Sequence, residues 1–242
     1  MNELTYVFRD AWLQWDRVVP MDAWVRLQQV MTHDIMSSDR GDGEGRMRPS
    51  MLADNCARRK MLSFHGYRAD EASDTMLVLG ELGTWNHYRQ QLMGLSTGLL
   101  DDIEVPVHSQ ELLISGSIDG ITPDGKGVEI KTVHTDYYRR LFYKADVEKE
   151  PLEKHLIQIH AYMRAMNTKQ FLLVYLNRSD GEITEFTVTY DSTIDSQLDL
   201  IINPLVAHAE NGTLPDLLPL CKQMKGTIYN DCLWKEACFN EL

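Results

Sequence analysis

Two consecutive apolar stretches in the middle of the chain end in, or contain, charged residues that belong together chemically. The first leads into Asp119, and the second, Gly127–Val133, contains Glu129 and Lys131. Thr122–Gly125 between them carries Pro-Asp-Gly, a turn signal, so the pair is predicted to form a β-hairpin. Because side chains alternate along a strand, Glu129 and Lys131 share a face, and the pairing places Asp119 near Glu129.

Two carboxylates and an ammonium at one place are the minimal set of functional groups for metal-dependent cleavage of a phosphodiester. Carboxylate oxygens suit Mg²⁺ or Mn²⁺. Such a metal activates water and neutralises charge on the phosphate. Lys131 would orient the water or stabilise the developing negative charge. The alternative is a surface pair of Glu129 and Lys131 that contributes little. Glu-x-Lys is common by chance, so the motif needs support elsewhere in the chain.

A histidine on an upstream helix is a candidate for a further metal ligand. The helix is predicted over Asp74–Met93, and Gly83 lies one turn before His87, which leaves room beside the imidazole. An imidazole ligand would shift the preference from Mg²⁺ toward Mn²⁺. The alternative is a histidine whose hydrogen bonds are satisfied where the helix meets the sheet.

The helix that follows the Glu-x-Lys strand carries polar groups beside its buried face. Apolar residues from Leu152 to Met166 recur at spacings of three and four, which predicts an amphipathic helix. Gln158 and Tyr162 are four residues apart and share a neighbouring face with His155. These groups are candidates for lining the active site and touching a phosphate backbone. The alternative is that these residues are ordinary polar side chains on the flank of an amphipathic helix.

Taken in order, these residues resemble the RecB-like branch of the PD-(D/E)xK nucleases from about Ser50 onward. The motifs are Gly83-x-x-x-His87, Gly116-x-x-Asp119, Glu129-x-Lys131 and Gln158-x-x-x-Tyr162. The resemblance implies that His87, Asp119, Glu129 and the Ile130 carbonyl bind metal and that Lys131 is catalytic. It implies that Gln158 and Tyr162 contact Lys131 or DNA. The proline of the family's name is absent, with Ile118 in its place.

The four cysteines, Cys56, Cys221, Cys232 and Cys238, point to a second metal centre. No secretory signal is visible at the start of the sequence, and the thiols of a cytosolic protein stay reduced, which favours metal binding over disulfides. Zinc sites usually show paired C-x₂₋₄-C spacings, which are absent. One cysteine early and three near the end resemble RecB-like nucleases with a 4Fe–4S cluster, namely AddB-type and CRISPR spacer-acquisition nucleases. Cys221 fits that spacing least well, and unrelated buried thiols are the alternative.

The net charge of −12 argues against a protein that coats nucleic acid, because duplex binders are usually basic. Bound divalent ions and local basic patches leave room for a nuclease. The candidate DNA-binding residues lie in two clusters, one around the first cysteine and one after the Glu-x-Lys strand: Arg58, Arg59, Tyr138, Arg139 and Arg140. Aromatic rings beside basic groups suit single-stranded DNA. A solvated amphipathic helix explains the second cluster equally well.

The chain of 242 residues is long enough for one domain with a sizeable core, or for one domain with a small appendage. Residues 1–49 are predicted to form an N-terminal helical segment and a mobile loop, and residues 50–242 the nuclease domain with the cysteine segment at its end. The predicted class is a mixed α/β (α+β) fold with a restriction-endonuclease-like core, in which helices flank a short mixed sheet. No apolar stretch approaches the length of a membrane span.

These features predict a cytoplasmic, Mg²⁺- or Mn²⁺-dependent DNA exonuclease or end-processing nuclease that carries a 4Fe–4S cluster. Single-stranded DNA is the expected substrate, and the resemblance adds a recombination or CRISPR-adaptation protein as an expected partner. Three alternatives stay open: a restriction-like endonuclease on duplex DNA, a non-catalytic DNA-binding or assembly module with the same fold, and a zinc-stabilised interaction protein.

Overall fold

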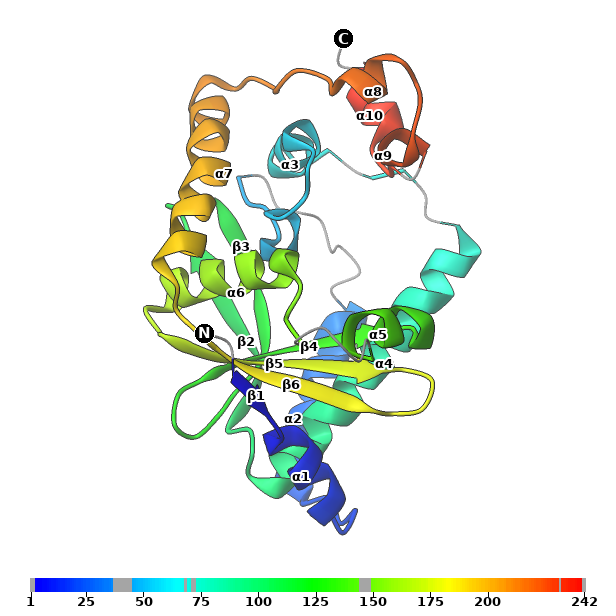
Figure 1. The fold of residues 1–242 in the computed structure, drawn as a ribbon, viewed down its shortest axis with the longest axis vertical. Helices are drawn as coiled ribbons and strands as arrows, with labels where there is room; N and C mark the ends of the chain where they lie inside the picture. Colours follow the sequence, from blue (N-terminus) through cyan, green and yellow to red (C-terminus); the bar gives the residue numbers. More distant parts are fainter. Residues whose placement is uncertain are drawn as a thin grey trace.

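The computed structural model describes residues 3–36, 45–67, 69–70, 73–143, 149–230 and 232–240. Its centre is a mixed sheet of six strands in the order β1-β6-β5-β4-β3-β2 (Figure 1). Only the β4–β5 pair is parallel among these strands. The strands are β1 (Glu3–Thr5), β2 (Asp102–Ser109), β3 (Ile114–Ile121), β4 (Gly127–Val133), β5 (Gln170–Asn177) and β6 (Ile183–Thr189). The predicted mixed α/β class is therefore confirmed.

Helices cover both faces of the sheet and form an arch beyond it (Figure 1). They are α1 (Val7–Gln14), α2 (Met21–Met36), the 3₁₀ turn η1 (Pro49–Met51), α3 (Ala57–Phe64), α4 (Asp74–Thr97), α5 (Thr135–Phe142), α6 (Glu153–Met166), α7 (Ser192–Asn211), α8 (Pro219–Lys222), α9 (Thr227–Asn230) and α10 (Lys235–Asn240). None of the helices in the described ranges combines the length and the apolar composition needed to cross a membrane.

The central strand β5 shows how the two faces are filled. Phe171, Leu173 and Tyr175 belong to a cluster with residues of α5 and α6, whereas Leu172 and Val174 belong to a cluster with residues of α1, α2 and α4. Alternate side chains of one strand thus serve two cores, as expected for a strand buried on both faces. A third cluster joins α3, α6 and α7 with Met47 and Leu52, which flank η1, and with Ile114 at the start of β3.

The predicted hairpin is confirmed, but its two strands stay paired over a short distance only. β3 and β4 pair at Gly120 with Val128 and at Ile121 with Gly127. Farther from the turn the two strands diverge, while β4 continues beside β5 along its whole length. The divergence opens the sheet next to Asp119 and Ile130.

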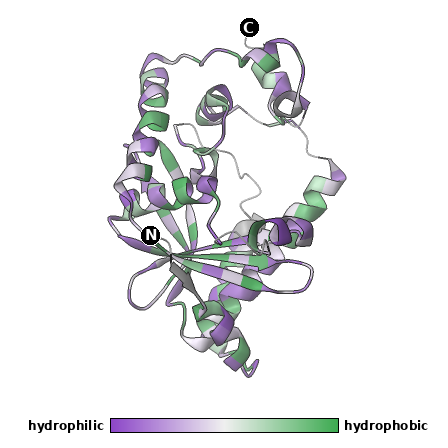
Figure 2. Ribbon diagram, in the orientation of Figure 1, coloured by the Kyte–Doolittle hydropathy of each residue, from purple (hydrophilic) through white to green (hydrophobic). Residues whose placement is uncertain are grey.

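The helix α4 begins and ends with clear local signals, and half of it stands away from the sheet. Ser73 caps the first turn by accepting from the Met76 amide, and Gly98 ends the helix with φ +70°. The first half projects from the body and is rich in apolar residues (Figures 1 and 2). Leu77 and Trp85 are more than half exposed there, at 57% and 59%. The second half packs on the sheet and carries the site residues.

The N-terminal segment joins the sheet through backbone contacts. β1 pairs with β6. The buried carboxylate of Glu185 on β6 accepts from the Phe8 amide at 2.7 Å and the Arg9 amide at 3.2 Å, which caps the start of α1. Residues 37–44 of the predicted mobile loop lie outside the described residues. The division of the chain at residue 49 stays a prediction.

Candidate functional site

Asp119 lies where β3 and β4 diverge, and it holds the backbone of the neighbouring strand. Its Oδ2 accepts from the Ile130 amide at 2.5 Å, and its Oδ1 lies 3.1 Å from His87 Nδ1 on α4. The N–H and C=O of one strand residue point to the same edge, so the Ile130 carbonyl also faces this opening. The four predicted metal-ligand positions, His87, Asp119, Glu129 and Ile130, are thus brought to one place.

Glu129 and Lys131 share a face of β4, as alternation predicts, and α6 contacts both. Lys131 Nζ donates to Glu129 Oε1 at 2.6 Å and to Gln158 Oε1 at 2.9 Å. Gln158 Nε2 donates to the same Glu129 oxygen at 2.8 Å. Tyr162 Oη donates to the Ser117 carbonyl on β3 at 2.8 Å and accepts from Gln158 Nε2 at 3.4 Å. Four of the predicted catalytic residues, Glu129, Lys131, Gln158 and Tyr162, therefore form one connected network, and Asp119 lies beside it on the Ile130 amide.

The ionisation of this network is set by burial and by neighbouring charges. Burial raises the pKa of Glu129 to about 7. The charge of Lys131 lowers this pKa, and the nearby carboxylate of Asp119 raises it. Burial also opposes the ionised form of Asp119, but His87 and the Ile130 amide lower its pKa below the usual value. The Asp119 carboxylate in turn raises the pKa of His87, although burial acts the other way. In the metal-free protein the two carboxyl groups thus titrate far apart.

A polar layer behind Asp119 was not predicted from the sequence. Gln91 Nε2 donates to the Asp119 carbonyl at 2.9 Å and to Glu104 Oε1 at 2.7 Å, and Ser117 Oγ donates to Glu104 Oε2 at 2.5 Å. Glu104 has φ +47°, an uncommon backbone conformation for a residue other than glycine. Gln91 follows His87 by one helical turn, a signal that could have identified it. Nothing in the sequence marked Glu104.

A cleft of about 280 Å³ opens beside Lys131, on the side of α6. Its lining residues come from η1 and the segment after it, from β4, and from the first turns of α6: Ser50, Ala53, Asp54, Lys131, Lys154, His155 and Gln158. His155 is buried, and burial followed by the charges of Lys131 and Lys154 lowers its pKa to about 3. The cleft therefore presents lysine ammonium groups and a neutral imidazole next to the candidate catalytic residues.

The four cysteines line one enclosed cavity beside the start of α3. Cys56 caps the start of α3, and Cys221, Cys232 and Cys238 come from the C-terminal segment that folds onto α3. All four are free thiols, and burial raises the pKa of Cys56, Cys221 and Cys238. The structure thus brings together all four residues that the sequence assigned to one metal centre.

Neither place is a ready-made metal site. Within the described ranges no three His, Cys, Asp or Glu side chains are arranged to hold a metal ion. At the sheet, hydrogen bonds from the Ile130 amide, Lys131 and Gln158 occupy carboxylate oxygens that a cation would share. The cysteine cavity has about 20 Å³ of free volume, about enough for one water. The donor types suit a hard cation at the sheet and a thiophilic metal at the cysteines, and both sites would have to adjust.

The predicted DNA-binding residues divide into buried and exposed ones. Arg58 is buried, and it donates to the Pro215 carbonyl at 3.0 Å and to the Cys238 carbonyl at 3.2 Å. Tyr138 is fully buried with its hydroxyl on Thr184. The prediction that these two contact DNA is wrong, because both side chains belong to the interior.

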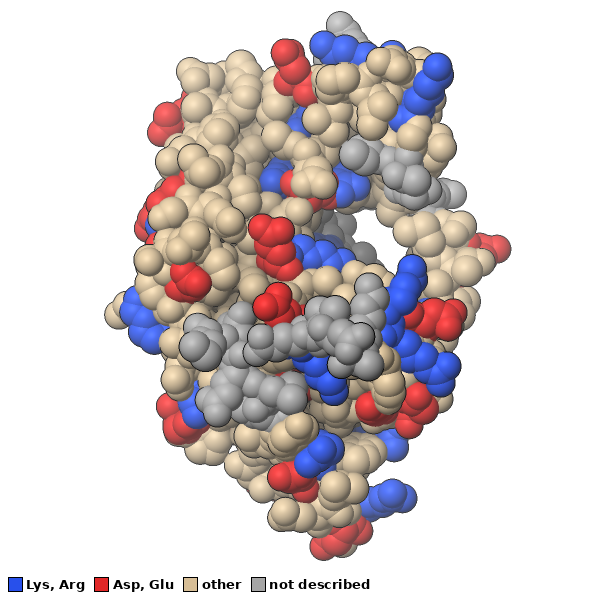
Figure 3. Space-filling view, in the orientation of Figure 1, with Lys and Arg blue, Asp and Glu red and all other residues tan. Residues whose placement is uncertain are grey.

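Three predicted DNA-binding residues retain access to solvent. Arg139 and Arg140 are exposed on α5. Arg59 is partly exposed, forms an ion pair with Asp54 and lies over the Trp234 ring at 5.7 Å. Figure 3 shows basic side chains around the opening in the middle of this face of the molecule, with acidic ones among them. The DNA-binding role of Arg59, Arg139 and Arg140 stays a prediction.

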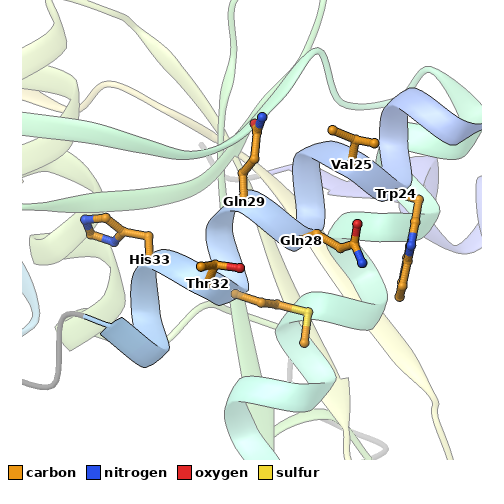
Figure 4. A pocket seen from close by; sticks show the side chains of 7 residues that line it. Trp24, Val25, Gln28, Gln29, Thr32 and His33 are labelled. Carbon is orange, nitrogen blue, oxygen red and sulfur yellow. The ribbon is translucent and has the colours of Figure 1, made fainter.

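A larger hollow of about 760 Å³ lies along α2 and has a different character. Its lining residues shown in Figure 4 include Trp24, Gln28, Gln29, Thr32 and His33, and all come from this one helix. Their side chains fan out around α2 (Figure 4). Polar groups that orient a ligand usually converge from several elements, as they do beside Lys131. The candidate active site is therefore the sheet opening and its cleft.

Comparisons with known proteins give a structural likeness and no sequence match. No protein-family model matches the chain, and no curated protein matches it. The alkaline exonuclease LHK-Exo from Laribacter hongkongensis superposes with a TM-score of 0.51 at 16% identity, covering 69% of this chain and 89% of that one. Its structure in complex with dAMP gives 0.50 at the same identity and coverage. This chain therefore shares its fold with that exonuclease.

Proposed function

We propose that this protein is a divalent-metal-dependent DNA exonuclease or end-processing nuclease. The observation that carries the proposal is the convergence of Asp119, Glu129 and Lys131 at the point where β3 and β4 diverge. Two carboxylates and an ammonium beside a cleft are the groups that phosphodiester hydrolysis needs. The fold shared with an alkaline exonuclease supports the same conclusion.

Each residue of the network has a defined task in this proposal. His87, Asp119, Glu129 and the Ile130 carbonyl would hold Mg²⁺ or Mn²⁺, which supplies a Lewis acid for the activation of water and the neutralisation of phosphate charge. Lys131 places its ammonium beside the attacked phosphate, and Gln158 fixes the ammonium through its amide oxygen. Tyr162 ties α6 to β3 and so holds Gln158 in register. Tyr162 is thus a positioning residue.

The cysteine cavity is proposed to hold a structural 4Fe–4S cluster. Four thiols from distant parts of the chain line one enclosed cavity, which is the donor set of such clusters. Binding would require loss of the thiol protons, whose pKa values burial raises, and an outward shift of the cavity wall. The cluster would fasten the C-terminal segment to α3.

The proposed substrate is DNA, as single strands or as ends, in the cytoplasm. The chain has a net charge of −12, which disfavours sustained binding to a long duplex. Exposed Arg139 and Arg140 lie close in sequence to the Glu-x-Lys strand and provide basic contacts. A recombination or CRISPR-adaptation protein remains the proposed partner class.

Digestion of end-labelled single- and double-stranded DNA with Mg²⁺, Mn²⁺ or EDTA tests the proposal. We expect metal-dependent release of short products from single strands, and a fall of about 100- to 1000-fold in single-turnover rate for Lys131→Ala. Lys126→Ala, in the nearby hairpin turn, removes the same charge and should retain the wild-type rate. Equal rates for the wild type and Lys131→Ala would overturn the catalytic assignment.

A covalently closed circular single strand separates exonuclease from endonuclease action. An enzyme that needs an end leaves the circle intact. Cutting of the circle, or faster cutting of closed duplex, would favour the restriction-like endonuclease that shares this fold class. Specific DNA binding without cleavage under any metal would favour the non-catalytic module.

A further inference from the structure

We propose that the cleft beside Lys131 is a subsite for a single backbone phosphate of the nucleic acid, bound by Lys154, His155 and Ser50. This inference rests on the proposed function and names a contact of the same site. The cleft is lined where η1 and the segment after it pack against the start of α6 and the face of β4. Its volume of about 280 Å³ lies just below the range of about 300–1,000 Å³ for small-molecule sites, which suits a group as small as one phosphate.

The start of α6 gives the cleft its positive character. Lys154 lies in the first turn, and the N-cap residue Leu152 provides no side-chain cap for the amides of that turn. The positive end of the helix dipole adds to the charges of Lys154 and Lys131. Two lysines, a helix start and a serine hydroxyl from η1 thus line the same space.

Hydrogen bonding determines what His155 presents to the cleft. The Leu152 amide donates to the Tyr175 hydroxyl oxygen at 3.0 Å, and the same hydroxyl lies 2.8 Å from His155 Nδ1. Tyr175 is fully buried, so its own proton needs an acceptor, and Nδ1 provides one. The pKa of His155 is lowered to about 3, chiefly by burial, so the ring is neutral and carries its proton on Nε2. His155 therefore offers a neutral N–H donor, which suits a phosphate oxygen.

The acidic residue Asp54 also lines the cleft, but its charge is compensated from behind. Its Oδ1 accepts from the Cys56 amide at 2.9 Å, and its Oδ2 forms an ion pair with Arg59. The cleft thus keeps a local positive potential in a chain whose net charge is −12. Lys154 supplies most of that potential, because Lys131 is paired with Glu129 and Asp54 with Arg59.

The position of Lys131 relates the subsite to the proposed reaction. Lys131 lines the cleft and donates to Glu129 and Gln158 at its border. A strand with one phosphate beside Asp119 and Glu129 would therefore place a neighbouring phosphate in the cleft. The subsite holds the strand in register and takes no part in bond breaking.

Binding of dAMP to the whole chain in metal-free buffer tests the subsite without any need for cleavage. Isothermal titration should detect dAMP and show no binding of deoxyadenosine, which lacks the phosphate. Lys154→Gln should weaken dAMP binding about 10-fold, as expected for the loss of one charged hydrogen bond. Lys154→Arg should stay within about twofold of the wild type. Lys169→Gln, just beyond the other end of α6, is the charge-matched control and should not differ from the wild type.

Kinetics on a single-stranded oligonucleotide give a second readout. Lys154→Gln should raise KM about 10-fold, leave kcat within about threefold and reduce the salt dependence of binding by about one phosphate contact. Equal effects of Lys154→Gln and Lys169→Gln, or binding of inorganic phosphate but not dAMP, would overturn the subsite. Lys154-dependent dAMP binding by a protein that cleaves no DNA would support the subsite and refute the nuclease. Cleavage of DNA by Lys154→Gln with an unchanged KM would refute the subsite and support the nuclease.

Discussion

The carboxylate site on the sheet and the cysteine cavity are held together by different means. Asp119 and Glu129 sit on adjacent strands, and backbone pairing together with hydrogen bonds from Ile130, Lys131 and Gln158 fixes them. The cavity is formed where the C-terminal segment folds onto α3. In the described residues Arg58 donates to two carbonyls of that segment, and Asp70 accepts from the amides that begin α10.

This difference predicts how each site would respond to the metal proposed for it. The sheet positions its carboxylates before any ligand arrives, so a cation there would act on chemistry more than on folding. The cysteine segment packs through short helices and a few side-chain contacts, and a metal that cross-links four thiols would contribute directly to its folding. Removal of metal should therefore abolish cleavage at the sheet and free the cysteine segment from α3.

The largest expected effect is the loss of iron on substitution of one thiol. Cys238→Ser removes a donor from the cavity and should lower the iron retained per chain at least about 10-fold, with proteolysis now cutting the segment after α7. Iron analysis and limited proteolysis measure this, and circular dichroism should show the sheet intact. Leu220→Ser, exposed on the same segment, is the control. A variant that keeps its iron would contradict the cysteine site, and a colourless wild type containing zinc would contradict the iron–sulfur cluster.

The next effect concerns the pH dependence of stability in metal-free buffer. Burial raises the folded-state pKa of Glu129 to about 7 from its ordinary 4.5. A group whose pKa is raised on folding contributes its full stabilisation at pH values below its pKa in the unfolded chain. That contribution is lost as the pH rises through its pKa in the folded protein. The Glu129 contribution to stability should therefore fall on the order of 3 kcal/mol between pH 4.5 and pH 7. The lowered pKa of His155, about 3, acts the other way and adds stability as the pH rises toward 6.5. The raised pKa of His87 extends the fall above pH 6.5.

Glu129→Gln should remove the falling contribution, because glutamine cannot ionise, so the stability of the variant should rise more between pH 4.5 and pH 7 than that of the wild type. Urea unfolding at several pH values measures it, and Glu81→Gln, exposed on the projecting half of α4, is the control. A variant with the same pH slope as the wild type would show that another buried group governs the titration.

The smallest effect lies at the boundary between the two regions. Arg59 pairs with Asp54 of the cleft and lines the cysteine cavity, yet its side chain is 27% exposed. Partly exposed ion pairs contribute about 0–1 kcal/mol. Arg59→Ala should lower the unfolding temperature by a few degrees and change neither the iron content nor the cleavage rate by more than about threefold. A tenfold loss of DNA affinity would instead support the predicted role of Arg59 in DNA binding.

Short-range patterns in the sequence were sufficient to predict the core of the fold. Alternation placed Glu129 and Lys131 on one face, and the turn at Thr122–Gly125 predicted the pairing that brings Asp119 beside them. Helical spacing predicted that Gln158 and Tyr162 act together. These predictions worked because strand and helix periods depend on local geometry, which a single sequence displays.

Such local patterns could not predict which side chains are buried or what they contact in the folded chain. Arg58 and Tyr138 looked like solvent-accessible partners for DNA, but contacts with the C-terminal segment and with Thr184 bury them. Glu104 joins the site only because β2 places it opposite Asp119. The role proposed for Lys154 and Ser50 depends on the packing of η1 against α6.

The sequence by itself determined the order of the elements, the charged trio on the hairpin and the cysteine set, since each depends on residue type and spacing. The tertiary structure decided where β3 and β4 diverge, which basic residues stay exposed, and that a donor-lined cleft adjoins Lys131. Those outcomes depend on the packing of segments distant in the chain, and the free energy of such contacts cannot be obtained from spacing alone.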